Sequence, residues 1–289
     1  MKLGVFTVML PAYAPAEAVA ALAAAGFDGV EWRVKDSLPE HAAESPSFWR
    51  NNRCTWAPGE AAGQQARAMA VQAGLELPCG GAYVEVGDEA GFHKALAFAR
   101  GAGLPRMRLL TARWKPGSHY RQLFDRTCAF WDWAVPQAAG VGVKLLGETH
   151  HDTICPSASL LMRLLSRYPA SDVGMLYDPG NMVWEGYEAY DLGLQLASEY
   201  LAHVHLKNVR FETDAEGRQR PRWSSLWTGV VSPAEVFRAL HRVGYDGWIC
   251  LEDFSGEHID NAWLRANCER LRQMWVDIGH VDRGPAPLR

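Results

Sequence analysis

Residues 141–181 read VGVKLLGETHHDTICPSASLLMRLLSRYPASDVGMLYDPGN, and the pattern within this stretch recurs along the chain. Two short apolar runs, Val141–Glu148 and Val173–Asp178, flank the segment Pro156–Tyr168, which begins with Pro-Ser and carries leucines at helical spacing. Continuous runs rich in Val, Leu and Ile are typical of strands that are buried on both faces. The stretch therefore predicts a strand–helix–strand unit with two parallel strands.

The same alternation extends outward in both directions. Further strands are predicted at Leu3–Thr7, Gly29–Arg33, Leu75–Cys79, Arg106–Thr111, His203–Val209 and Gly247–Asp253. Further helices are predicted at Pro15–Ala25, Glu60–Ala73, Glu89–Gly101, Tyr120–Ala139, Tyr190–Tyr200, Ser232–Val243 and Asp260–Asp277. Eight such units of about 36 residues each match an α/β fold of the (β/α)8 TIM-barrel type. We predict a single barrel domain over residues 1–289 with a peripheral tail at 279–289. A doubly wound open sheet is the alternative, but no G-x-G-x-x-G follows the first strand.

Composition and charge exclude several classes of protein. Hydrophobic residues make up 48% of the 289 residues and charged residues 21%, which excludes a disordered chain. The net charge of −4 lacks the basic excess of a DNA-binding protein, so no nucleic-acid partner is expected. No apolar run reaches the length of a membrane span, and Pro11 and Pro15 interrupt the one N-terminal stretch that resembles a signal peptide. Six cysteines without C-x-x-C pairs indicate reduced thiols in a cytoplasmic protein.

Four polar residues at strand ends are the candidate ligands of a metal ion. In a barrel, such residues point into the active-site mouth. Glu148, Asp178, His205 and Glu252, here called the four-residue cluster, each follow an apolar run on one of four neighbouring strands. Three carboxylates in one pocket repel one another unless a cation is present. This donor set favours Mn²⁺ or Mg²⁺ and also suits Co²⁺ and Zn²⁺. The alternative is that the acids pair with Arg or Lys side chains.

Other polar and aromatic residues near the strand ends are candidates for substrate binding. They are His150, Asn181, Lys207, Arg210, Trp114 and Glu31. Strand alternation puts His150 on the side of Glu148, and it predicts that His151 faces away. Lys207 is expected to neutralise an oxyanion or to pair with an acid, whereas His203 lies one layer deeper and suits the core.

Two long connections and several tryptophans complete the predicted mouth of the barrel. The connections Asp36–Pro58 and Phe211–Thr228 follow the second and seventh strands, so both are expected on the C-terminal face. Tryptophans stack well on sugar C–H groups. The candidates for the walls of a sugar pocket are Trp32, Trp56, Trp114, Trp184 and Trp227, and packing within loops is the alternative for each.

Five motifs resemble those of the xylose-isomerase-like TIM-barrel superfamily of sugar isomerases and epimerases. They are GFDGVE at 26–31, LGETH at 146–150, LYDPGN at 176–181, HVHLKN at 203–208 and GYDGWICLE at 244–252. The superfamily includes ketose 3-epimerases, inosose dehydratases, hydroxypyruvate isomerase and, more distantly, endonuclease IV. The resemblance extends over nearly the whole chain. It implies that the four-residue cluster holds one divalent metal, often Mn²⁺.

The resemblance also implies roles for the two glutamates. In ketose 3-epimerases, the residues that match Glu148 and Glu252 move the proton on opposite faces of the substrate carbon. Those enzymes carry a histidine three residues after the aspartate ligand, where this chain has Asn181. Endonuclease IV holds three metals with additional histidines, and this acidic chain lacks the full set.

The expected activity is therefore that of a metal-dependent sugar isomerase or epimerase. Glu148 or Glu252 would remove the proton α to a carbonyl through a metal-stabilised enediolate. A lyase of the same fold is the alternative, either an inosose-type dehydratase or an enzyme that cleaves 3-oxo-glycosides, as C-glycoside deglycosidases do. A degenerate barrel that only binds a ligand is the non-enzyme alternative. The expected partner is a small carbohydrate or keto-sugar, and a homo-oligomer or a partner subunit is also expected.

Overall fold

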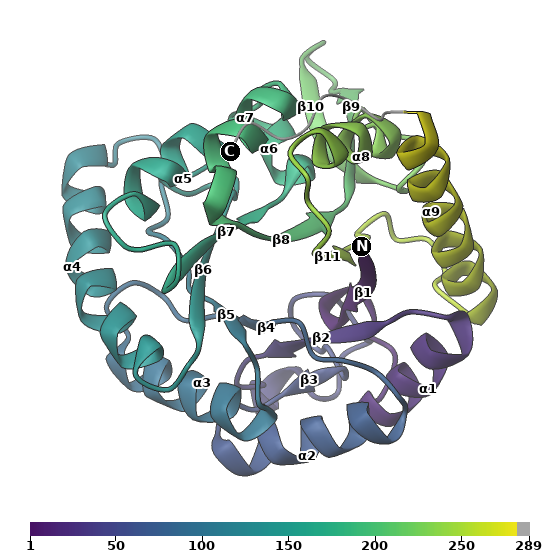
Figure 1. The fold of residues 1–289 in the computed structure, drawn as a ribbon, viewed down its shortest axis with the longest axis horizontal. Helices are drawn as coiled ribbons and strands as arrows, with labels where there is room; N and C mark the ends of the chain where they lie inside the picture. Colours follow the sequence, from purple (N-terminus) through teal and green to yellow (C-terminus); the bar gives the residue numbers. More distant parts are fainter. Residues whose placement is uncertain (282–289) are drawn as a thin grey trace.

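Eight parallel strands close into a barrel in the computed structural model, which describes residues 1–281 (Figure 1). The strands are β1 (Lys2–Phe6), β2 (Gly29–Val34), β4 (Gly80–Ala82), β5 (Arg106–Arg108), β6 (Lys144–Glu148), β7 (Val173–Tyr177), β8 (Leu201–Leu206) and β11 (Trp248–Leu251). They are hydrogen-bonded in this order, and β1 pairs with both β2 and β11 to close the ring. The predicted (β/α)8 TIM barrel is confirmed.

Helices surround the barrel, and Figure 1 shows them as an outer ring. They are α1 (Pro15–Ala25), α2 (Glu60–Gln72), α3 (Glu89–Ala102), α4 (Tyr120–Ala139), α5 (Ala158–Leu165), α7 (Tyr190–Ala197), α8 (Pro233–Arg242) and α9 (Asn261–Val281). The ranges of α1 and α4 were predicted correctly, and the other helices differ from their predictions only at the ends. The predicted tail begins inside α9, and residues 282–289 lie outside the described residues. Among residues 1–281, no helix combines the length and hydropathy needed to cross a membrane.

One predicted strand is wrong in position, and another extends past the end of the observed strand. β4 begins at Gly80, after the predicted range Leu75–Cys79, in which Glu76 makes an isolated bridge to Gly29. Pro78 lies in that range and has no N–H to donate to a neighbouring strand, which is why regular pairing starts later. The predicted strand His203–Val209 contains parts of two strands, because β8 ends at Leu206 and the antiparallel strand β9 begins two residues later.

Several short elements were not predicted. β9 (Asn208–Thr213) and β10 (Gln219–Ser224) form a hairpin that projects from the rim of the barrel (Figure 1). β3 (Thr55–Trp56) pairs with β2, and three 3-10 helices span Thr7–Met9, Pro39–His41 and Ser198–Tyr200. A short helix, α6 (Pro179–Glu185), follows β7 directly. The Asp178 side chain caps α6 by accepting a hydrogen bond from the Asn181 N–H, 2.9 Å away, and proline occupies the first helical position.

The two-residue period of the strands determines which side chains reach the mouth of the barrel. Cys79, Leu146 and Leu176 pack together as a small apolar cluster inside the barrel, separate from the large core between strands and helices. Because side chains two residues apart on a strand share a face, Glu148 and Asp178 follow Leu146 and Leu176 on the interior side. The same two-residue spacing along one face of the strand applies on β8 and β11. The interior apolar layer therefore lies below a polar layer at the C-terminal ends of the strands.

Candidate active site

The structure brings the four-residue cluster together at the C-terminal ends of four adjacent strands. Glu148 ends β6, Asp178 follows β7, His205 lies near the end of β8, and Glu252 follows β11. All four residues are buried, and each offers a ligand atom within 4.8 Å of those of the other three. The arrangement has the donor types and the spacing of a divalent metal site.

Two buried cations also contact the carboxylates of the cluster. Arg108 Nη1 donates to Glu148 Oε2 at 2.8 Å. Lys207 Nζ lies 2.9 Å from Asp178 Oδ2 and donates to a carboxylate oxygen of Glu252. The alternative expected for strand-end acids, pairing with Arg or Lys, is thus present in the structure. This pairing does not occupy every potential ligand atom, because Arg108 donates to only one of the two oxygens of Glu148.

The cluster still offers atoms that fit a metal ion beside these ion pairs. The second oxygen of Glu148, Oε1, lies 3.5 Å from His205 Nδ1, and Glu252 Oε2, which also accepts from Lys207, lies 3.8 Å from the same nitrogen. His205 Nδ1 is buried and has no hydrogen-bond partner within residues 1–281. A buried nitrogen without a partner that faces two carboxylates is the geometry expected of a metal ligand, because an unsatisfied buried polar atom is otherwise costly.

The local charges shift the pKa values of the two glutamates in opposite directions. Burial alone would raise the pKa of Glu148, but Arg108 and His205 hold it well below its ordinary value. Burial raises the pKa of Glu252 despite the charges of Lys207 and His205. Two carboxyl groups with diverging pKa values in one site are the usual arrangement for acid–base catalysis.

A cavity of about 450 Å³ opens onto the cluster. Glu148, Glu252 and Lys207 lie in its wall. The rest of its lining is formed by Lys35, Trp49, Tyr83, Glu85, Arg108, Leu110, Thr111, Arg113, His150, His151, Asp152, Thr153, Trp223 and Phe254. This volume and the mixture of aromatic and convergent polar groups are typical of a small-molecule site.

Three of the six predicted substrate-binding residues lie in or beside this cavity. His150 and Lys207 line it. Asn181 is buried next to it, and its amide nitrogen donates to Asp178 at 2.9 Å and to Glu148 at 3.3 Å. The prediction that His151 faces away is wrong. β6 ends at Glu148, so strand alternation stops there, and His151 lines the cavity with its Nδ1 2.9 Å from Asn181 Oδ1.

The other three predicted substrate-binding residues lie outside the cavity. Glu31 is fully buried beneath the cluster and bonds to two histidines. Arg210 lies on the exposed β9–β10 hairpin, where its guanidinium pairs with Glu212 at 2.6 Å. Trp114 packs against the hydrophobic core. None of the three residues lines the cavity, and their contacts with a substrate stay predictions.

The aromatic walls of the cavity were not predicted. Trp49, Trp223 and Phe254 line it, and none of the five expected tryptophans does so. Trp184 stacks on His151 at 4.8 Å, and Trp32 is fully buried. The remaining three, Trp56, Trp114 and Trp227, pack against the core.

Arg108 is the most consequential residue that the sequence analysis missed. It lies at the end of β5, two residues after Arg106, and is buried against Glu148. Strand alternation could have placed it on the interior face, because it follows the buried Met107 in a strand and precedes a run of apolar residues. Arg108 Cζ lies 5.3 Å from the ring centroid of Phe6 and 4.7 Å from that of Tyr83. These cation–π contacts hold the guanidinium in place.

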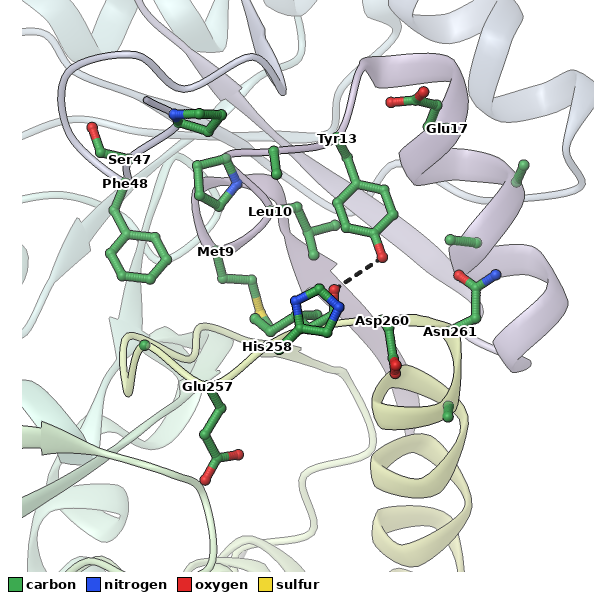
Figure 2. Close-up of a pocket in the computed structure, with 18 of the residues that line it drawn as sticks. Met9, Leu10, Tyr13, Glu17, Ser47, Phe48, Glu257, His258, Asp260 and Asn261 are labelled. Atoms are coloured by element: carbon green, nitrogen blue, oxygen red, sulfur yellow. Dashed lines mark hydrogen bonds between the residues drawn. The ribbon is translucent and has the colours of Figure 1, made fainter. Parts of the chain in front are cut away.

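Figure 2 shows a second and larger cavity, of about 1160 Å³. Met9, Leu10 and Phe48 contribute apolar walls, and the hydroxyl of Tyr13 donates to the carbonyl oxygen of Ile259 at 3.0 Å. Trp49 lines both cavities. Within the described part of the chain, the potential metal-ligand groups do not include residues of this second cavity. Glu148 and Glu252 of the four-residue cluster line the smaller cavity instead.

Comparison with known proteins agrees with the geometry. A family model described as xylose isomerase-like TIM barrel matches residues 19–274. An inosose dehydratase of Geobacillus thermodenitrificans (strain NG80-2) is 29% identical over 125 residues, which are 40% of this chain and 42% of that relative. The match thus spans about two fifths of the length of that relative.

Two solved structures share the fold at low sequence identity. An L-ribulose 3-epimerase superposes with a TM-score of 0.72 and 17% identity, covering 98% of this chain and 99% of that one. A protein called IOLI, with a bound zinc atom, superposes with a TM-score of 0.69 and 14% identity, covering 97% and 99%.

Proposed function

The chain belongs to the xylose isomerase-like TIM-barrel family, and from this premise we propose that it is a metal-dependent sugar isomerase or epimerase. The observation that carries the proposal is the convergence of three carboxylates and one imidazole at the end of a cavity of about 450 Å³. The resemblance of the fold to an L-ribulose 3-epimerase supports it. The reaction begins with removal of a proton α to a carbonyl.

The four-residue cluster would hold one divalent ion, and we propose Mn²⁺, with Mg²⁺, Co²⁺ and Zn²⁺ as alternatives. When bound, the ion would act as a Lewis acid that polarises the carbonyl oxygen of the substrate. Lys207 faces the cavity beside Glu252, and although burial opposes its charge, Asp178 and Glu252 raise the pKa of Lys207. Its ammonium can donate a hydrogen bond to a developing oxyanion.

Glu148 and Glu252 supply the proton transfers. Both line the cavity, and the opposite shifts of their pKa values fit one group that takes a proton and one that returns a proton. Return to the opposite face of the same carbon gives an epimer, and return to the neighbouring carbon gives an isomer. The position of the substrate determines which glutamate acts first.

Proton–deuterium exchange tests this proposal. The purified protein with Mn²⁺ is incubated in D₂O with a panel of keto-sugars and keto-polyols, and the products are analysed by NMR and mass spectrometry. Deuterium is expected at the carbon α to the carbonyl, together with a new epimer or isomer. Protein treated with a chelator is the control. If no ketone exchanges its α proton although the protein binds the metal, the proposal is wrong.

A lyase is the second candidate function. The observation that favours it is the sequence match to inosose dehydratases, together with Asn181 at the place where ketose 3-epimerases carry a histidine. Elimination shares the first proton transfer, and His150 lies in the cavity where a leaving group would depart. In the same experiment, release of water from an inosose-type ketone, or of an aglycone from a 3-oxo-glycoside, would support the lyase.

The remaining expectations on partners and location stay proposals. We propose a small carbohydrate or keto-sugar as the ligand, a cytoplasmic location, and assembly into a homo-oligomer or with a partner subunit. A barrel that has lost catalysis and only binds a ligand is the non-enzyme alternative. It would be supported if the protein binds no divalent metal and if Glu148→Gln leaves ligand binding unchanged.

Metal affinity is expected to rise with pH. Burial would lower the pKa of His205, but Glu31, Glu148 and Glu252 raise it well above its ordinary value, which favours the protonated imidazole when no metal is bound. Metal and proton compete for the ring nitrogen that faces the cluster, and higher pH therefore favours the metal. Calorimetric titration with Mn²⁺ should show tighter binding at about pH 8 than at about pH 6, by up to about tenfold per pH unit for one released proton. Affinity that is independent of pH would contradict coordination by His205.

A further inference from the structure

Glu31 lies one layer below the cluster and contacts one of its members directly. Its side chain comes from β2, is fully buried, and does not line the cavity. Glu31 Oε2 accepts hydrogen bonds from Nε2 of His205 at 3.0 Å and from Nε2 of His203 at 2.8 Å. The two ring N–H groups are the donors in these contacts, because a carboxylate oxygen accepts hydrogen bonds.

The hydrogen bond between Glu31 and His205 determines which nitrogen of the His205 ring faces the other ligands of the cluster. Because Nε2 donates to Glu31, the other ring nitrogen, Nδ1, is directed toward Glu148 and Glu252, at 3.5 Å and 3.8 Å. The ring is also held from its face, since Phe6 stacks on it with centroids 5.3 Å apart and an interplanar angle of 24°. The other Glu31 oxygen, Oε1, is buried and has no hydrogen-bond partner among the residues that the structure describes.

We propose that Glu31 is a positioning residue, which holds the Nε2 proton of His205 and thereby presents Nδ1 to the metal. The proposal rests on the proposed function, which identifies the group bound by Nδ1 as a metal ion. A carboxylate that accepts the second ring N–H of a ligating histidine fixes the orientation of the ring and increases its basicity. Loss of such a partner typically lowers metal affinity by about 10- to 100-fold.

A second metal ion bound in the same buried layer is the alternative, and the test must distinguish it from the positioning role. Glu31, His203 and Cys250 each offer one ligand atom within 4.8 Å of the others. A second ion could be bound there only if it shared the carboxylate with the two N–H donors, and this polar layer is fully enclosed. The positioning role predicts one ion per chain.

Variants of the buried layer test the proposal by metal affinity. In Glu31→Leu, which has a similar size and no acceptor, Mn²⁺ affinity measured by calorimetry is expected to fall by about 10- to 100-fold. Glu31→Gln retains a neutral acceptor and should show a smaller loss, and it serves as the second variant if Glu31→Leu does not fold. His203→Gln is the matched control, because it replaces the other imidazole with an amide that can still donate and leaves the Glu31–His205 bond. Its affinity should stay within about threefold of the wild type. Equal losses in Glu31→Leu and His203→Gln would overturn the proposal.

A second readout does not depend on the metal. In protein treated with a chelator, imidazole ¹⁵N–¹H NMR should show an exchange-protected Nε2 proton of His205 that is absent in Glu31→Leu. If the wild type binds no metal but shows this proton, the proposed function fails and the positioning contact stands. If the proton is absent in the wild type, the positioning role is wrong whatever the activity. Two ions per chain, one of them lost in Cys250→Ser, would also overturn it.

Discussion

Glu148→Gln is expected to lower kcat/KM for the substrate identified by deuterium exchange by about 10³-fold or more. Glu148 combines two roles in the proposed reaction, since it is a candidate ligand and a candidate base in the wall of the cavity. General base catalysis alone contributes about 10²- to 10⁴-fold. Glutamine keeps the shape but removes the charge, and it leaves the Arg108 guanidinium without the carboxylate at 2.8 Å.

The measurement combines steady-state kinetics with exchange of the substrate α proton. Glu252→Gln should also abolish turnover. If Glu252 acts only in the second step, this variant should retain part of the exchange of the substrate α proton. Glu76→Gln is the control, because Glu76 forms an exposed ion pair with Lys2 away from the cavity, and its kcat/KM should stay within about twofold of the wild type. If Glu148→Gln keeps more than a tenth of the activity in a folded protein, Glu148 is not the base.

The two-residue period of strands explains why the cluster could be predicted from sequence. Glu148, Asp178 and Glu252 each end a run of buried apolar residues, and in a parallel barrel those ends meet at one face. The prediction failed where a strand stopped earlier than assumed. His151 faces the cavity because the chain leaves β6 at Glu148, and alternation no longer applies.

The walls of the cavity depend on contacts that no local pattern reports. Trp49 lies in the long connection after β2, and Trp223 lies in a hairpin after β8. They meet around Phe254, with ring centroids 4.8 Å and 5.5 Å from it, although the three are far apart in sequence. Turn and loop geometry of this kind depends on the whole fold. The amino-acid sequence therefore places the connections on the correct face but does not identify the tryptophans that line the site.

Glu31 shows a different limit of sequence reasoning. It follows Val30 on β2 and was expected in the mouth of the barrel, but its carboxylate is fully buried between two histidines of β8. The depth of a residue along a barrel depends on the stagger between strands, and β8 is three strands away from β2 around the ring. Sequence alone gives the face of a strand but not its height relative to a distant strand.

Arg108→Met is expected to destabilise the metal-free protein by about 3 to 5 kcal/mol, because it leaves a buried carboxylate without its cation. Arg108 and Glu148 are both about 3% exposed, so solvent screens their ion pair only weakly. The same change at Arg113, which forms an exposed pair with Glu85, should cost about 1 kcal/mol or less. Urea unfolding in the presence of a chelator measures both variants.

The pH dependence of this loss follows from the pKa of Glu148, which lies below its ordinary value in the folded protein. A lowered carboxyl pKa stabilises the folded state above the unfolded-state pKa, and this contribution disappears as pH falls through the folded-state value. The difference between wild type and Arg108→Met should therefore be largest near neutral pH and should shrink in acid, where Glu148 is protonated in both proteins. The double variant Arg108→Met/Glu148→Leu should recover much of the stability, since neither charge is then left unpaired. A double variant as unstable as Arg108→Met would show that Arg108 acts through its packing on Phe6 and Tyr83 rather than through its charge.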